Sequence, residues 1–97
     1  MSSRNALLNS EERVIASNIY RIISEAKKQY SENAIEAVKS FVEEEIKAIT
    51  DFRLDYVEIA DVDTLQTLKD EEKDNPAILC IAVFLGSVRL IDNILLN

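Results

Sequence analysis

Three neighbouring residues near the start of the chain have side chains that suit phosphate binding. Ser2 and Ser3 each carry a hydroxyl group, and Arg4 carries a guanidinium group. Together they can donate several hydrogen bonds to a polyphosphate, and the planar guanidinium matches phosphate oxygens in pairs. Because terminal segments are often disordered, the alternative interpretation is a free tail that binds nothing.

Three charged residues, Asp55, Arg89 and Asp92, interrupt segments that are otherwise apolar. One interpretation is a polar patch that faces a binding site. The other is a structural ion pair across a sheet, or a set of charges on an exposed face. We favour the structural interpretation because ion-pair networks often serve only the fold.

The acidic runs and the single cysteine predict neither a metal site nor a nucleophile. Acidic residues fill positions 43–45 and 70–72. Consecutive helical residues point about 100° apart, so three adjacent Glu side chains cannot converge on one ion. Cys80 lies among apolar neighbours, and we expect an inert core residue. We therefore predict no catalytic residue and no metal site in this chain.

The composition excludes further classes of protein. The 97 residues include 18 Asp+Glu, 11 Lys+Arg and no His, for a net charge of −7. Without His there is no Ser-His-Asp triad and no His-ligated zinc. A single glycine, Gly86, excludes a glycine-rich phosphate loop. The acidic excess argues against a nucleic-acid partner and against a basic membrane-surface protein.

Cysteine and apolar content indicate where the protein works. One Cys cannot form an internal disulfide, which fits a reducing cytoplasm. The longest apolar run, residues 77–85, is shorter than the roughly 17–25 residues that span a bilayer. The N-terminus has no apolar core of a signal peptide. We therefore predict a cytoplasmic protein without a membrane partner.

The first half of the chain predicts two helices. Ser10 is the predicted N-cap of a helix over residues 10–29, since apolar residues recur every three or four positions from Ile15 to Tyr30. A second stripe, from Ile35 to Ile49, predicts a helix over residues 32–49. So short a connection predicts an antiparallel hairpin of helices.

The second half predicts a small sheet. The predicted segments are a strand at 52–60, a short helix or turn with an Asp cap at 61–68, a charged loop at 70–75 closed by Pro76, a strand at 78–85, a tight turn at 86–87 and a returning strand at 88–95. The predicted fold is α+β: an antiparallel helix hairpin packed on a small, mainly antiparallel three-stranded sheet, in one domain over residues 1–97.

The central predicted strand is apolar on both faces. Leu79, Ile81 and Val83 alternate with Cys80 and Phe84. Such strands are normally covered on both sides, and two helices can cover only one. We therefore expect the isolated chain to expose an apolar face or to form a homodimer, although a net charge of −7 opposes association.

Several short motifs, in order and across nearly the whole chain, resemble one family. They are Met-Ser-Ser-Arg-Asn at 1–5 with Leu8 and Glu-Glu-Arg at 11–13, Leu-Asp-Tyr-Val-Glu at 54–58, Asp-Thr-Leu at 63–65, Leu-Gly at 85–86 and Arg-Leu-Ile-Asp-Asn at 89–93. The set resembles the C-terminal domain of the pantothenate synthetase (pantoate–β-alanine ligase) family. The departures are Val88, where Thr is common, and an unusually acidic loop at 69–76.

The resemblance implies an activity and its substrates. The family joins pantoate to β-alanine in two steps: ATP adenylates the pantoate carboxylate and releases pyrophosphate, and the β-alanine amine then displaces AMP. ATP and Mg²⁺ are therefore implied for the full-length enzyme, with neither bound stably by this chain. A preceding nucleotide-binding domain with a paired-His motif holds the pantoate and β-alanine pockets. Because this chain has no His, we expect that domain to be absent and the chain alone to be inactive.

The resemblance also assigns roles to residues. Ser2, Ser3 and Arg4, with Met1 at the edge, match a variant of the flexible signature loop of class I aminoacyl-tRNA synthetases and related nucleotidyltransferases. This implies that they close over the triphosphate and offset the charge that builds on the leaving pyrophosphate. The rest of the domain would act as a hinged lid that keeps water from the acyl-adenylate.

Two alternatives from other functional classes stay open. One is a stand-alone acidic α+β interaction module without catalytic activity, whose N-terminal likeness is due to chance. The other is an acidic adaptor that binds a basic partner. An upstream, in-frame α/β domain that carries His-x-Gly-His would favour the ligase over both.

Overall fold

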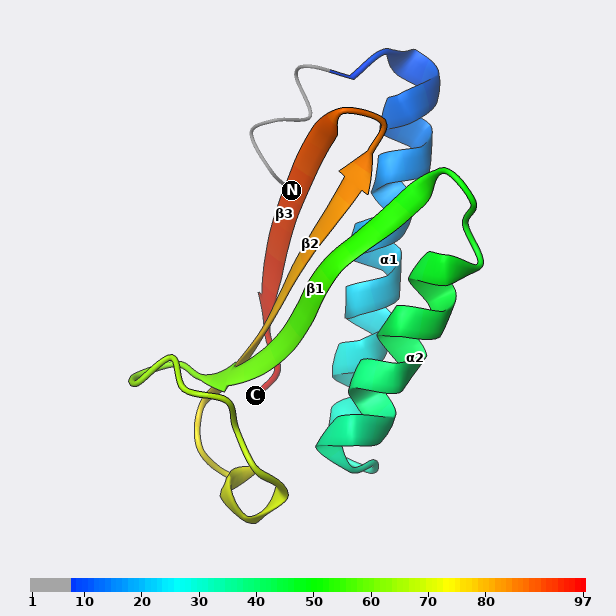
Figure 1. Cartoon of the computed structure of the whole chain (residues 1–97). Helices are drawn as coiled ribbons and strands as arrows, with labels where there is room; N and C mark the ends of the chain where they lie inside the picture. The colour runs from blue at the N-terminus through cyan, green and yellow to red at the C-terminus, as the bar shows by residue number, and fades with distance from the viewer. Residues whose placement is uncertain (1–7) are drawn as a thin grey trace.

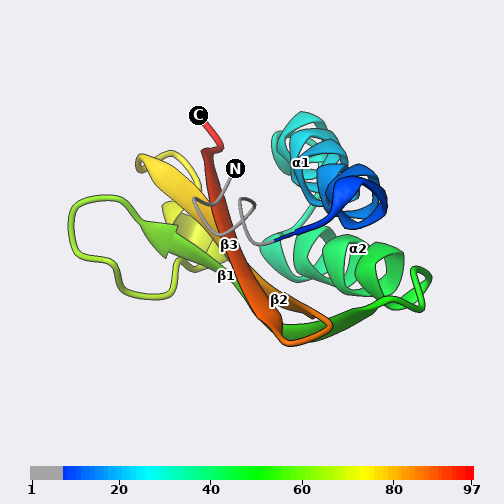
Figure 2. The ribbon, with the colours of Figure 1, turned by 90° about the horizontal axis from the view of Figure 1, so that it is seen from above.

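The computed structural model describes residues 8–97 and shows two helices followed by three strands. The elements are α1 (Ser10–Tyr30), α2 (Ile35–Lys47), β1 (Phe52–Asp61), the short 3-10 helix η2 (Asp70–Glu72), β2 (Ala77–Leu85) and β3 (Val88–Leu95). The strands form an antiparallel sheet in the order β1-β2-β3. Both helices pack on the same face of this sheet (Figures 1 and 2). The predicted α+β fold is therefore confirmed.

α1 begins where predicted, but its N-cap is Asn9 and not Ser10. The Asn9 Oδ1 accepts a hydrogen bond from the Glu12 amide at 2.8 Å, and the Glu12 carboxylate accepts one from the Asn9 amide at 3.2 Å. This reciprocal pair is a capping box, which satisfies two amides at once. The predicted cap was wrong by one residue because Glu12 lies three positions after Asn9.

α2 is shorter at both ends than the predicted helix over residues 32–49. It begins at Ile35, and its N-cap residue, Ala34, makes no side-chain hydrogen bond. The predicted start at residue 32 is wrong because residues 31–33 lie in the turn that joins the two helices. The remaining length still suffices for a buried stripe of Ile35, Val38, Val42 and Ile46.

The strands agree with the prediction to within one residue at each end. β1 and β2 pair from Phe52 with Leu85 to Asp61 with Ala77, and a bulge interrupts the register at Asp55. β2 and β3 are joined by the predicted tight turn, where Gly86 has a φ of +61°. Only glycine adopts that left-handed conformation without a steric cost, which explains the chain's one glycine at this position.

The predicted short helix or turn over residues 61–68 is a turn that returns along the edge of β1. The Asp61 carboxylate caps it by accepting hydrogen bonds from the amides of Asp63 and Thr64. The chain then bridges Thr67 to Ala60, and the Leu68 amide donates to the Ile59 carbonyl. The charged loop that follows contains η2, a single turn that the sequence did not predict.

The core lies between the helices and one face of the sheet. Alternate residues of β2 point toward the helices and are buried, as are apolar residues of β1 and β3 that share this face. The β2 members are Ala77, Leu79, Ile81, Val83 and Leu85. The alternation agrees with the predicted orientation of the central strand.

The opposite side of the sheet, here called the outer sheet face, has no helix over it among residues 8–97 (Figure 2). Tyr56, Ile91 and Leu95 on this face are 41%, 37% and 53% exposed. The face comprises Arg53, Tyr56, Glu58, Ala60, Ile78, Cys80, Ala82, Phe84, Arg89, Ile91, Asn93 and Leu95. The expected exposure of an apolar face is therefore present in the described part of the chain.

Candidate functional site

The predicted phosphate-binding residues, Met1, Ser2, Ser3 and Arg4, lie outside the described residues. The structure describes the chain from Leu8 onward. Leu8 is 5% exposed and belongs to the core, and the capping box of α1 follows it directly. A Cβ atom at Gly86 would lie 3.8 Å from the Glu12 carboxylate, so this helix start lies beside the β2–β3 turn. Leu8 and the capping box therefore fix the start of the described chain, four positions after Arg4.

Two of the three charges inside the strands form an ion pair. Asp55 Oδ2 lies 2.9 Å from Arg89 Nη2 and accepts a hydrogen bond from Arg89 Nε at 3.0 Å. The pair connects β1 to β3 across the central strand, and both side chains are a little over one-third exposed. The favoured interpretation, a structural ion pair across the sheet, is therefore confirmed for these two residues.

The third charge, Asp92, does not join that pair. Its register partner is Ile81, so its side chain lies on the helix-facing side of β3 while Arg89 lies on the outer sheet face. Its Oδ1 accepts a hydrogen bond from the Asn93 amide at 2.9 Å. A polar patch that combines all three residues is therefore excluded by the alternation of the strand.

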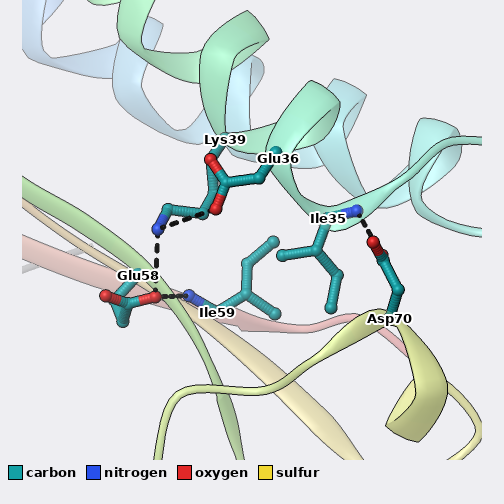
Figure 3. Close-up of polar contacts among 6 residues, drawn as sticks. All are labelled: Ile35, Glu36, Lys39, Glu58, Ile59 and Asp70. Carbon is teal, nitrogen blue, oxygen red and sulfur yellow. Dashed lines mark hydrogen bonds and ion pairs between the residues drawn. The ribbon is translucent and has the colours of Figure 1, made fainter.

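A second charged group fastens α2 to β1 (Figure 3). Lys39 Nζ lies 3.2 Å from Glu58 Oε1 and 3.9 Å from Glu36 Oε1. The same Glu58 oxygen accepts a hydrogen bond from the Ile59 amide at 3.1 Å. The Lys39 side chain is only 16% exposed, so its charge is held by these carboxylates. Because these contacts join a helix to a strand, we interpret the charged group as structural.

The loop between β1 and β2 clamps both helices near their connection. The Asp70 carboxylate accepts a hydrogen bond from the Ile35 amide at 2.8 Å (Figure 3). The Lys73 ammonium donates to the carbonyls of Tyr30 and Asn33 and lies 4.7 Å from the centre of the Tyr30 ring. An anion at the start of α2 and a cation at the end of α1 both complement the helix dipoles. Sequence reasoning missed this clamp.

Two open grooves flank that clamp. One has a volume of about 460 Å³ and is lined by Tyr30, Ser31, Lys73, Asp74, Leu96 and Asn97. The other, of about 340 Å³, lies beside Ile35 and Asp70. Burial, then Asp70 and Asp74, raise the pKa of the Tyr30 hydroxyl above its ordinary value, so the phenol is no base. The Tyr30 side chain therefore supplies no general base to the first groove at neutral pH.

The described residues offer no metal centre and no activated thiol. No group of three or more Cys, Asp or Glu side chains within residues 8–97 is arranged to hold a metal ion. Burial, and then the Glu58 carboxylate, raise the pKa of the Cys80 thiol above its ordinary value. A thiol with a raised pKa is a poor nucleophile at neutral pH. Within residues 8–97, no helix has both the length and the apolar character needed to cross a membrane.

Comparison with known proteins gives one consistent match. A family model described as pantoate-beta-alanine ligase matches residues 1–95, a range that includes Met1, Ser2, Ser3 and Arg4. The pantothenate synthetase of Porphyromonas gingivalis ATCC 33277 is 40% identical over 94 residues, which are 97% of this chain and 34% of that protein. The pantothenate synthetase of Phocaeicola vulgatus is 43% identical over 94 residues, 33% of its length.

A solved structure shares the fold as well as the sequence. The crystal structure of pantothenate synthetase from Thermus thermophilus superposes with a TM-score of 0.85 at 30% identity. The match covers 99% of this chain and 34% of that one. The chain thus spans about a third of the length of the curated relatives that it matches.

Proposed function

We propose a function from one premise: the chain belongs to the pantoate-beta-alanine ligase family. We propose that it serves as the C-terminal domain of an enzyme that condenses pantoate with β-alanine through a pantoyl-adenylate, releasing AMP and pyrophosphate. The observation that carries this proposal is the match over residues 1–95, because it includes the segment suited to phosphate binding as well as the folded body. The site of the reaction would be the cytoplasm, where ATP is available.

In this proposal, Ser2, Ser3 and Arg4 hold the phosphates of ATP, with Met1 at the edge of the segment. Their hydroxyl and guanidinium donors would stabilise the negative charge that grows on pyrophosphate as it leaves. The buried Leu8 and the capping box of Asn9 and Glu12 support the idea, because they fix the chain from Leu8 onward, four positions after Arg4. A fixed helix start would allow the short segment before it to be positioned by movement of the whole domain.

The pantoate, the β-alanine and the catalytic groups would belong to the part of the family's longer chain that residues 1–97 do not cover. Mg²⁺ would arrive with the ATP phosphates as part of the substrate, since residues 8–97 supply no cluster of ligands for it. The domain would close over the nucleotide and exclude water, which protects an acyl-adenylate from hydrolysis. The 97-residue chain alone would accordingly be inactive.

A chimeric enzyme tests this function. Residues 1–97 replace the matching 94 residues of the Porphyromonas gingivalis pantothenate synthetase, and formation of AMP and pantothenate is measured with pantoate, β-alanine, ATP and Mg²⁺. We expect an active chimera and no AMP from the 97-residue chain alone. A chimera that is folded by circular dichroism but makes no pantothenate would contradict the proposal.

A substitution in the chimera tests the phosphate role. Arg4→Ala should slow adenylation by about a hundredfold, the order expected for a lost donor to a developing anion. It should affect pantoate binding much less. The matched control is Arg21→Ala, which removes an exposed arginine of α1 that donates a hydrogen bond to Asn18. Equal losses in adenylation rate and pantoate affinity would argue against a contact with the phosphates.

A further inference from the structure

We propose that the outer sheet face is the surface through which this domain docks on the rest of the family's longer chain. The inference rests on the proposed function, since it assumes that the domain works as part of such a chain. It goes further by naming the docking side of the domain. The helices cover one side of the sheet, and within residues 8–97 no helix covers the outer sheet face (Figure 2).

Burial separates the two sides. Leu79, Ile81 and Val83 of β2, which face the helices, are fully buried. On the outer sheet face the small Ala60 and Ala82 are buried, but Ile78, Cys80 and Phe84 are only half-buried, and Ile91 and Leu95 of β3 are exposed. An antiparallel sheet with one solvated face normally alternates apolar and polar residues, whereas β2 is apolar on both faces. Within residues 8–97, helices cover only one face of the sheet (Figure 2).

The charge of the outer sheet face favours association with another surface. The molecule carries a net charge of −7. The charged residues on and beside this face balance, because Arg53 and Arg89 are matched by Asp55 and Glu58. The acidic excess therefore lies on other parts of the chain. Surfaces between domains of one chain are typically of this mixed, weakly polar kind, and they allow the domains to separate.

Arg53 indicates the chemistry of the surface that meets this face. Its guanidinium lies 4.3 Å from the centre of the Phe84 ring, a stacked cation–π contact. Within residues 8–97 no carboxylate forms an ion pair with it, whereas Arg89 and Lys39 both have carboxylate partners. A stacked guanidinium keeps its N–H edge free to bind an acidic group. The docking surface should therefore be apolar, with a carboxylate opposite Arg53.

The length of the relatives identifies the occupant. In the Thermus thermophilus structure this fold makes up 34% of a longer chain. A neighbour in the same chain is present at a high effective concentration, so even a modest, half-exposed apolar face becomes occupied. A second copy of this chain lacks that advantage, and each copy carries a net charge of −7 that repels the other. The same-chain neighbour is therefore the occupant that the charges and the chain length favour.

Cys80 reports directly on this surface. It is the chain's only cysteine and lies on the outer sheet face between Glu58 and Asn93 in the strand register. The test compares the alkylation rate of Cys80 by iodoacetamide, measured by mass spectrometry at one pH, in the 97-residue chain and in a chimera whose other cysteines are replaced. Docking should slow the reaction in the chimera by about tenfold. Equal rates in the two proteins would overturn the proposal.

Matched variants test whether the outer sheet face is the surface that protects Cys80 from alkylation. Ile91→Glu on the outer sheet face should return the Cys80 rate in the chimera to that of the free chain, and Leu95→Glu is a second variant in a more exposed position. Val14→Glu is the control, since Val14 is a 70% exposed apolar residue of α1. Protection that survives both outer-face variants would place the interface elsewhere and overturn the proposal.

Three further readouts distinguish the remaining outcomes. If the Cys80 rate in the free chain falls as its concentration rises, and light scattering shows a dimer, a second copy is the occupant and the proposal fails. An active chimera with unprotected Cys80 overturns the docking face and leaves the proposed function standing. A folded but inactive chimera with protected Cys80 contradicts the function and supports the docking face.

If the chimera does not fold, binding of an apolar dye by the free chain is the deciding measurement. Loss of dye binding in Ile91→Glu but not in Val14→Glu supports the proposal. Absence of dye binding by the unmodified chain overturns it.

Discussion

The carboxylate of Asp70 caps a helix that begins 35 residues earlier in the chain. Its Oδ1 accepts a hydrogen bond from the amide of Ile35, the first residue of α2, at 2.8 Å (Figure 3). Ala34, the N-cap residue, has no side chain that can accept a hydrogen bond. The positive end of α2 is therefore satisfied by a residue of the loop between β1 and β2, and this loop holds the helix hairpin in place.

Asp70→Ala should destabilise the fold by about 1 kcal/mol, the usual effect of removing an N-cap side chain. The reason is that the Ile35 amide loses its acceptor and no neighbouring side chain replaces it. Urea unfolding followed by circular dichroism measures the change. The control is Glu71→Ala, which removes an exposed acid of η2 without a role at α2. Equal stability of the two variants would show that the cap contributes nothing.

The sequence predicted the elements of the fold because each has a strong local pattern. The spacing from Ile15 to Tyr30, the apolar run at 78–85 and the turn at Gly86 all lie within short windows. The start of α2 was placed too early because its cap lies in a distant loop, which no local pattern reveals. The loop itself was predicted only as charged, since its clamps depend on tertiary contacts of Asp70 and Lys73.

The candidate site was predicted unevenly for the same reason. An ion pair across the sheet was one of the predicted alternatives for Asp55, Arg89 and Asp92, but only the structure shows that Asp55 is the partner of Arg89. Asp92 could not be assigned, because the face on which it lies depends on the exact strand register. The approach of Lys39 to Glu58 joins a helix to a strand edge, and the spacing of Glu36 and Lys39 was its only local signal.

Breaking the pair of Asp55 and Arg89 should change stability only slightly. Both side chains are more than one-third exposed, and ion pairs at such positions contribute about 0–1 kcal/mol. A double-mutant cycle with Asp55→Ala and Arg89→Ala, measured by urea unfolding, gives the coupling energy. A coupling well above that range would mean that the pair organises the sheet and is not a minor surface contact.

Alkaline pH should destabilise the fold through Cys80. Burial raises the pKa of its thiol in the folded state above the ordinary value of 9.0, so the folded chain holds this proton more tightly than the unfolded chain. The contribution to stability is full below the unfolded pKa and is lost as pH rises through the folded pKa. Cys80→Ala should reduce the loss of stability above pH 9.0.

The alkylation rate of Cys80 against pH checks the same shift directly. Its midpoint should lie above 9.0 in the folded chain and should fall toward that value in urea. Tyr30, whose pKa is also raised, titrates in a higher range because its ordinary value is 10.0, so Cys80→Ala separates the two groups. A folded-state midpoint at or below 9.0 would contradict the burial of this thiol.

Lys73→Met should destabilise the chain by about 1 kcal/mol, because the carbonyls of Tyr30 and Asn33 lose a charged donor at the end of α1. Met keeps much of the apolar length of the side chain, so the loss reports on the ammonium group. Lys69→Met is the control, since Lys69 is an exposed lysine of the same loop. The measurement is again urea unfolding.

The double variant of Asp70→Ala and Lys73→Met tests whether the loop acts as one clamp. Both side chains project from one short loop, to the start of α2 and the end of α1 respectively. Once one contact is lost, the loop is less fixed and the second contact contributes less, so the double variant should lose less stability than the two single variants combined. Strict additivity would instead mean that the loop is held independently, for which the Asn97 side chain, bound to the carbonyls of Lys73 and Asn75, offers the physical basis.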